Sequence, residues 1–297
     1  MTLGADQTEL PSADYMNILR EHSHRLQAVK LLPGLRLNEY FCGESFYLST
    51  LAECSAFVEG REACLLKSSA FPGSGKGLNW CKGIFTPFIS GWCARVAASQ
   101  GGVVGEPIYN KVEDFAMEFY ADGRGRVVFA GYSVFHTGGS GMYAGNDLLS
   151  DEKILQKLSA YVPQEEFIRL RTRLEEELSA LFGGFYHGYL GVDMMICHFP
   201  DEAPVYRIHP CVEINLRMNM GVVAWLLTDR YLAADAEGVF RIDYYPLAGQ
   251  ALEEHRQMSA SFPLSVENNR VCAGYLPLVP VTPQSRYRAF LLLTLPQ

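Results

Sequence analysis

The stretch from His209 to Arg217, which reads HPCVEINLR, constrains the fold more than any other part of the sequence. Successive side chains of a β-strand point to opposite faces of the sheet. Read as a strand, it has an apolar face of Pro210, Val212, Ile214 and Leu216, and a polar face of His209, Cys211, Glu213, Asn215 and Arg217. Polar groups are costly to bury without partners, so this face is not made for packing. It suits a hard divalent cation with a phosphate behind it.

Length and charge limit the classes of protein to consider. The 297 residues are enough for one large core or for two packed lobes. No apolar run reaches the roughly eighteen residues of a membrane span, and the N-terminus has no basic and apolar segments typical of a secretory signal. The net charge of -8 argues against a broad nucleic-acid surface. We therefore expect a cytoplasmic protein that binds neither nucleic acid nor membrane.

The eight cysteines do not indicate a metal site. The sequence has no CxxC motif and no Cys/His cluster with zinc spacing. Cys64 and Cys197 lie within apolar runs, where cysteine behaves as a small buried hydrophobe. We expect reduced thiols.

The pattern of apolar residues predicts a mixture of helices and strands. The expected helices cover residues 13–31, 45–58, 84–98, 151–182 with a break near Pro163, and 220–232. The expected strands cover 63–69, 103–109, a hairpin over 113–135 with its turn at 122–125, 191–199 and 205–217, with two or three more in the tail. Antiparallel hairpins prevail over regular βαβ alternation, which favours the α+β class.

A lysine and a glycine-rich loop follow one of these strands. Lys67 ends the strand at 63–69, and FPGSGKG (71–77) comes next. Backbone N–H groups of such a loop can surround phosphates. The loop is not a Walker A motif, because Ala70 stands where the first glycine is required and Gly77 follows Lys76. By itself, a surface turn with a solvated lysine explains the segment equally well.

Three further carboxylates lie at positions that packing alone does not explain. Glu106 ends an apolar run, and Asp114 would share a strand face with Ala116, Glu118 and Tyr120. A polar edge face is the alternative for this strand. Asp193 begins an otherwise apolar strand, and an exposed turn carboxylate is the equal alternative there. Magnesium prefers one or two carboxylates together with phosphate oxygens, which Asp193, Glu213 and Asn215 on adjacent strands would supply.

Taken in order, these segments resemble the ATP-grasp superfamily of ligases, from about residue 63 to 222. VEINLRMNMG is the most specific part of the resemblance. The resemblance implies that Lys67 contacts the nucleotide phosphates and that FPGSGKG, with Ser74, Gly75 and Lys76, closes over them. It places Glu106 and Ile108 at the adenine-binding hinge and Asp114 near the ribose, with Glu113 as the alternative.

The resemblance also assigns the reaction centre and the division into lobes. It implies that Asp193, Glu213 and Asn215 are magnesium ligands, that Arg217 lies near the transferred phosphate, and that Lys67 and Arg217 assist catalysis. The expected fold is an α+β ATP-grasp fold whose two lobes hold the nucleotide between them. A reduced N-terminal region would cover residues 1–62, the small lobe 63–105 and the large lobe 106–297.

The resemblance implies an ATP- and magnesium-dependent ligase that joins a carboxylate to an amine through an acyl phosphate and releases ADP and phosphate. The substrates would be small-molecule or peptide carboxylates and amines, and a homodimer is compatible with the sequence. The alternatives are a phosphotransferase or a nucleotide-binding sensor or scaffold on the same fold. His209 is either a core residue or a residue that orients a carboxylate, and Cys211 is a packing residue or a substrate contact. Tyr143 and Asn146, in the glycine-rich segment 136–146, would form an acceptor pocket or an ordered loop.

Overall fold

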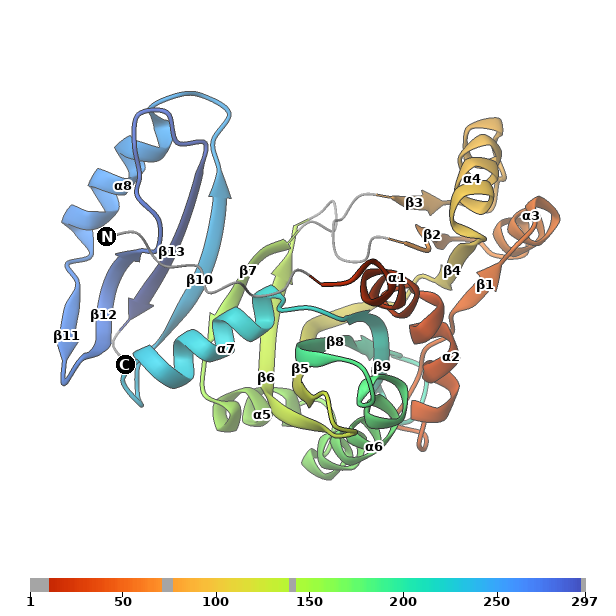
Figure 1. The fold of residues 1–297 in the computed structure, drawn as a ribbon, viewed down its shortest axis with the longest axis horizontal. Helices are drawn as coiled ribbons and strands as arrows, with labels where there is room; N and C mark the ends of the chain where they lie inside the picture. The colour runs from red at the N-terminus through yellow and green to blue at the C-terminus, as the bar shows by residue number, and fades with distance from the viewer. Residues whose placement is uncertain (1–10, 71–76, 139–142, 295–297) are drawn as a thin grey trace.

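The computed structural model describes residues 11–70, 77–138 and 143–294 and contains two antiparallel β-sheets (Figure 1). The small sheet has the strand order β1-β4-β2-β3. Its strands are β1 (Phe46–Leu48), β2 (Cys64–Ser68), β3 (Leu78–Cys81) and β4 (Val103–Pro107). Helices α3 (Leu51–Glu59) and α4 (Pro87–Gln100) pack on it, and their apolar residues share one core with those of the sheet.

The large sheet has nine strands in the order β11-β12-β13-β10-β7-β6-β5-β8-β9. They are β5 (Lys111–Asp122), β6 (Val127–Thr137), β7 (Tyr143–Leu148), β8 (His187–His198), β9 (Tyr206–Asn215), β10 (Glu237–Tyr244), β11 (Ser265–Glu267), β12 (Arg270–Pro277) and β13 (Tyr287–Thr294). The hairpin of β5 and β6 turns where it was predicted to turn. The Asp122 carboxylate accepts hydrogen bonds from the backbone N–H groups of Arg124 (2.7 Å) and Arg126 (3.1 Å) there.

Helices cover both faces of the large sheet. Helices α2 (Leu26–Leu35), α5 (Asp151–Ser159) and α6 (Gln164–Phe182) share a core with Phe115, Met117 and Phe119 of β5. Helix α7 (Met220–Tyr231) packs on the opposite face, because a Cβ atom added to Gly131 of β6 would meet the Trp225 ring. Helix α1 (Ala13–His22) buries none of its residues fully.

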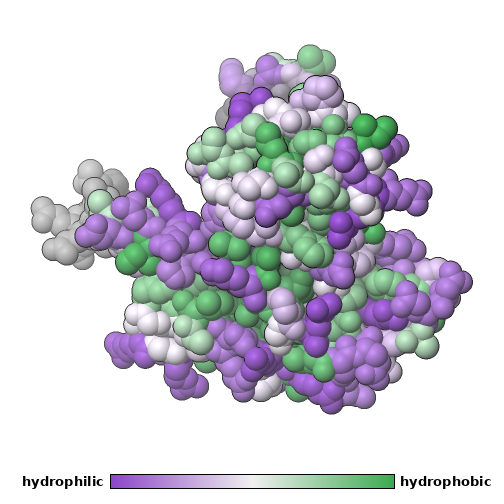
Figure 2. Space-filling model, turned by 90° about the vertical axis from the view of Figure 1, so that its right-hand side faces the viewer, coloured by the Kyte–Doolittle hydropathy of each residue, from purple (hydrophilic) through white to green (hydrophobic). Residues whose placement is uncertain are grey.

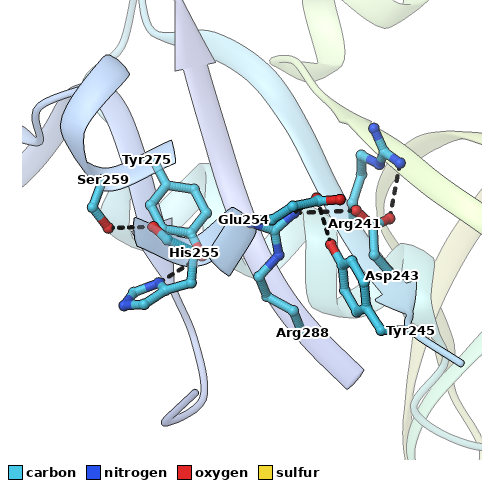
Figure 3. A network of polar contacts seen from close by, with 8 residues as sticks. All are labelled: Arg241, Asp243, Tyr245, Glu254, His255, Ser259, Tyr275 and Arg288. Carbon is cyan, nitrogen blue, oxygen red and sulfur yellow. Dashed lines mark hydrogen bonds and ion pairs between the residues drawn. The ribbon is translucent and has the colours of Figure 1, made fainter. Parts of the chain in front are cut away.

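The C-terminal part of the large sheet is held to helix α8 (Gln250–Ser261) by a polar network (Figure 3). The buried Arg288 guanidinium donates to Glu254 (3.1 Å) and lies 4.4 Å from the centroid of the Phe290 ring. The Tyr245 hydroxyl donates to the same Glu254 carboxylate at 2.8 Å. These contacts join α8 to β10 and β13.

Several predicted elements differ from the structure. The predicted helix 13–31 is two helices, because the chain turns between His22 and Leu26. The predicted helix 45–58 was wrong at its start, since residues 46–48 form β1 and the helix begins at 51, after the capping residue Thr50. Strands β3 and β7 and helix α8 were missed, and the tail has four strands. The division at residues 62 and 105 stays a prediction, although β1 pairs with β4 in the small sheet.

From the side of the small sheet, the molecule has a narrower upper body on a broader lower one (Figure 2). Hydrophilic and hydrophobic residues are interspersed over this face. Among the described residues, no helix combines the length and apolarity that crossing a membrane requires.

Candidate active site

The two sheets enclose a cavity of about 480 Å³, within the range typical of small-molecule sites. Leu65, Lys67 and Leu78 line it from the small sheet, and Ala116, Asp193 and Asn215 from the large sheet. The end of β4 and the start of the segment that joins the sheets, from Glu106 to Tyr109, also line it. Lys67, Glu106, Ile108, Asp114, Asp193, Glu213, Asn215 and Arg217, all singled out in the sequence, line this one cavity.

An ion pair forms the wall on the small-sheet side. The Lys67 ammonium lies 2.6 Å from the Glu106 carboxylate, and both side chains are buried. Leu65 of β2 is directly opposite Glu106 of β4, and Lys67 lies two residues further along β2, on the same face of the sheet. Burying either charge alone would be costly. The pair therefore keeps a lysine inside the cavity before any ligand arrives.

The strand register of the large sheet places polar side chains in two adjacent rows. The first row is Glu213, Asp193, Ala116 and Ser133, from β9 to β6. The second row is Asn215, Gly191, Glu118 and Gly131. The Asn215 amide donates to the Asp193 carboxylate at 2.9 Å. The three predicted magnesium ligands are thus neighbours.

The oxygen atoms of these three residues fit a hard cation. Glu213 Oε1 and Asn215 Oδ1 are buried and have no hydrogen-bond partner among the described residues. Burial and the nearby Glu213 and Glu118 carboxylates raise the pKa of Asp193 well above its ordinary value. A bound cation would reverse this effect. Within the described ranges, no three His, Cys, Asp or Glu side chains form a metal-binding group by themselves, so this set needs phosphate oxygens to complete it.

Arg25 contributes to the same cavity and was not recognised in the sequence. Its guanidinium donates to the Glu213 carboxylate at 3.2 Å and to the backbone carbonyl of Ser68, at the end of β2. Its backbone N–H donates to the Ser69 carbonyl at 2.9 Å, and its buried Nε atom has no partner within residues 11–70, 77–138 and 143–294. The turn between α1 and α2 thus brings a cation beside Glu213. No sequence pattern marks a contact between residues 188 positions apart.

Glu118 is the second residue whose importance the sequence did not show. It is fully buried, and its carboxylate accepts hydrogen bonds from the Ser133 hydroxyl (2.8 Å) and the Asn219 amide (2.9 Å). Burial raises its pKa to about 7, although the two hydrogen bonds act in the opposite direction. The shared strand face with Asp114 and Ala116 was the signal in the sequence.

Comparisons with known proteins identify the fold. The sequence matches no protein-family model and no curated protein. The structure is similar to N5-carboxyaminoimidazole synthetase from Staphylococcus aureus complexed with ADP, with a TM-score of 0.52, 11% identity, and coverage of 92% of this chain and 67% of that chain. The corresponding synthase from Aspergillus clavatus, in complex with ADP and 5-aminoimidazole ribonucleotide, gives a TM-score of 0.53, 13% identity, and coverage of 94% and 70%.

A biotin carboxylase from Campylobacter jejuni, complexed with β,γ-ATP, gives a TM-score of 0.53, 12% identity, and coverage of 96% of this chain and 64% of that chain. Both kinds of protein are ATP-grasp proteins. This chain has the ATP-grasp fold. The fold expected from the sequence resemblance is therefore confirmed.

Within the ATP-grasp fold, the structure distinguishes Asp114 from its neighbour Glu113. Asp114 lines the cavity, forms an ion pair with Lys111 and accepts a hydrogen bond from the Thr137 hydroxyl at 3.0 Å. Glu113 forms an ion pair with Lys157 of α5 at 3.1 Å instead. Ile108 lines the cavity and is 43% exposed. Ser74, Gly75 and Lys76 lie outside the described residues.

The middle of β9 departs from the simple alternation expected from the sequence. Met195 pairs with His209 while Asp193 pairs with Glu213, so β9 has two more residues than β8 in this interval. This β-bulge turns Cys211 into the core, whereas Glu213 and Asn215 face the cavity. The Cys211 thiol is therefore a packing residue.

His209 packs within the protein rather than lining the cavity. Its ring lies 5.5 Å from the Tyr109 ring and leaves no room for a side chain at Gly43. Burial lowers its pKa to about 3, so the imidazole is neutral.

Tyr143 and Asn146 do line the cavity. The Tyr143 hydroxyl donates to the Asn146 side chain at 2.6 Å, and that side chain donates to the Val134 carbonyl at 3.0 Å.

Proposed function

We propose that this chain is an ATP- and magnesium-dependent ligase that joins a carboxylate to an amine and releases ADP and phosphate. One observation carries the proposal: the cavity between the two sheets has the buried Lys67 on one wall and the row of Glu213 and Asp193 on the other. The names of similar structures support it, since they are synthetases and a carboxylase with ADP or an ATP form bound.

In this proposal, ATP lies along the cavity from the joining segment to β9. Glu106 and Ile108 contact the adenine, and Asp114 receives the ribose hydroxyls. The Lys67 ammonium turns from Glu106 toward the phosphates, and residues 74–76 contribute to the phosphate site. Arg25 adds a second cation, because its guanidinium already lies between the end of β2 and Glu213.

Asp193, Glu213 and Asn215 would hold the magnesium ion. When bound, the ion neutralises phosphate charge and aligns the terminal phosphate for transfer. One oxygen of Glu213 accepts a hydrogen bond from Arg25, and the other has no partner in the part of the chain that the structure describes. A ligand can therefore bind to Glu213 without breaking its contact with Arg25.

The proposed reaction needs no protein nucleophile. A substrate carboxylate oxygen attacks the terminal phosphorus of ATP, and the bond to the ADP oxygen breaks. The amine then attacks the acyl carbon, the bond to the phosphate oxygen breaks, the nitrogen gives up one proton to the departing phosphate, and an amide and inorganic phosphate result. Lys67 and Arg217 offset negative charge during phosphoryl transfer. Phosphoryl transfer depends on such positioning and charge neutralisation more than on covalent help.

A binding measurement followed by a turnover measurement tests the proposal. A thermal-shift assay with ATP or ADP plus magnesium should raise the unfolding temperature, since a ligand at a hundred times its dissociation constant adds roughly 2.7 kcal/mol. ADP release should then require both a carboxylate and an amine. Release without an amine would favour a phosphotransferase, and binding without release a sensor. No thermal shift would refute the nucleotide site.

Glu213→Gln and Glu166→Gln form a matched pair for this assay. Both carboxylates are buried and accept hydrogen bonds from arginine, but Glu166 lies on α6, away from the cavity. Glu213→Gln should abolish the magnesium-dependent part of nucleotide binding, and Glu166→Gln should retain it. Equal effects of the two substitutions would contradict the metal assignment.

The homodimer and the cytoplasmic location that the sequence suggested stay predictions.

A further inference from the structure

Glu118 differs from the other carboxylates that line the cavity. Glu106, Asp114 and Glu213 each form a salt bridge with a lysine or arginine. Asp193 belongs to the proposed magnesium ligands. Among the described residues, Glu118 forms no salt bridge, and its carboxylate contacts only a hydroxyl and an amide. A buried carboxylate without a cation is costly, and a cationic ligand would remove this cost.

Backbone of α7 and β8 packs closely against the Glu118 carboxylate, which lies behind the wall of the cavity. A Cβ atom added to Gly221, in the first turn of α7, would lie 2.0 Å from one carboxylate oxygen of Glu118. A Cβ atom added to Gly191 on β8 would lie 2.3 Å from the other oxygen. Backbone therefore encloses the carboxylate from two sides. Glu118 and Ser133 nevertheless line the cavity, and each carboxylate oxygen can accept one more hydrogen bond.

The position of this group relative to the metal row fits an acceptor substrate. Ser133 is the far member of the row that begins at Glu213, and Ala116, between Asp193 and Ser133, has only a methyl group. A ligand can therefore extend along the row from the metal side to Ser133. The transferred phosphate would be at one end and Glu118 at the other.

The hydrogen-bonding capacity of the group favours an ammonium over a second divalent cation. Asn219 turns its amide N–H₂ toward Glu118 and its oxygen toward the backbone N–H of Val222 (2.9 Å) in α7, so the oxygen faces away from the Glu118 carboxylate. Glu118 and the Ser133 hydroxyl remain. Calcium or magnesium needs about six oxygen ligands, whereas a primary ammonium has three N–H donors that these few acceptors can satisfy.

We propose that Glu118 and Ser133 form the binding site for the protonated amine of the acceptor substrate, with Glu118 as its counter-ion and Asn219 holding the Glu118 carboxylate in place. The inference rests on the proposed ligase function, because only that function requires an amine. Transfer of one proton from the bound ammonium to the Glu118 carboxylate would leave a neutral carboxylic acid and a neutral amine. The lone pair of that amine could then form the new C–N bond.

A simple amine tests this site without knowledge of the natural substrate. The probe is n-propylammonium chloride, compared with 1-propanol, which has a similar chain but no charge, and with sodium chloride at equal ionic strength. Thermal shifts are measured with and without Mg·ADP. We expect n-propylammonium alone among the three to raise the unfolding temperature of the wild-type protein.

Glu118→Gln is the decisive variant because glutamine keeps the shape of the side chain and can still bond to Ser133 and Asn219. It should lose the n-propylammonium shift and keep the Mg·ADP shift. Glu166→Gln, the buried control on α6, should keep both. If glutamine at 118 prevents folding, Ser133→Ala should reduce the n-propylammonium shift instead.

The outcomes separate the two proposals. A missing Mg·ADP shift in the wild-type protein refutes the nucleotide site, whatever the amine does. An Mg·ADP shift without an n-propylammonium shift overturns the amine site alone. The amine site also fails if Glu118→Gln retains the full n-propylammonium shift, or if 1-propanol gives the same shift as the amine.

Discussion

Glu118 makes a prediction about stability that does not depend on any ligand. Burial raises its pKa from 4.5 to about 7 in the folded protein. The folded state thus prefers the protonated acid. This preference stabilises the fold fully below pH 4.5, and the stabilisation is lost as the pH rises through about 7. Glu118→Gln removes this dependence because glutamine does not ionise.

The magnitude follows from the same values. The pKa of Glu118 differs between the unfolded chain (4.5) and the folded protein (about 7), and at about 1.4 kcal/mol per pKa unit this difference corresponds to about 3 kcal/mol of stability. As the pH rises from roughly 5 to 8, the free energy of unfolding of the wild-type protein should therefore fall by up to about 3 kcal/mol relative to that of Glu118→Gln.

Urea denaturation of both proteins across this pH range measures the difference in their free energies of unfolding, and the contributions of most other titrating groups cancel in that difference. The contribution of Asp193 does not cancel, because the Glu118 charge contributes to its raised pKa. The comparison is therefore repeated in an Asp193→Asn background. Parallel stability curves for the two proteins in that background would refute the account of Glu118 as a carboxylate that burial keeps partly protonated.

Three further substitutions test other parts of the site. Lys67→Ala should weaken ATP binding by about 1.5–3 kcal/mol, the usual size of a hydrogen bond to a charged group; unchanged affinity in calorimetry would count against the phosphate site. Arg25→Ala leaves Glu213 without its cation and should lower the free energy of unfolding by about 3–5 kcal/mol. The control is Arg36→Ala at an exposed position, which should change it by less than about 0.5 kcal/mol. Denaturant melts compare the two variants, and equal losses of stability would contradict the role of Arg25. Gly221→Ala should cost about 1–3 kcal/mol, because the new methyl group overlaps the Glu118 carboxylate; a melt with an unchanged midpoint would disprove that enclosure.

The sequence was informative where a local pattern carries the structure. Alternation on β9 predicted that Glu213 and Asn215 share a face, and the resemblance to the ATP-grasp superfamily predicted that Asp114 lies in the same cleft; all three line the cavity. Alternation failed at Cys211, because a β-bulge depends on the pairing of β9 with β8 and leaves no mark in β9 alone. Arg25 could not be predicted either, since its position depends on how the turn between two helices meets the end of β2.

Short elements were the other source of error. Residues 46–48 read as the start of a helix because three residues are too few to show an alternation. Their pairing with β4 comes from a partner more than fifty residues away. The role of Glu118 depends likewise on Asn219 and Ser133, which meet it only after the sheet and α7 have assembled.

The large sheet runs without interruption from β9, beside the cavity, to β11 at the far end of the chain's fold. Backbone hydrogen bonds link each strand to the next, so we expect the C-terminal strands and α8 to move together with β9. A change in the width of the cavity would then come from movement of the small sheet. A pair of spectroscopic labels on α4 and α8 would measure such opening and closing directly, with α8 serving as the fixed reference point.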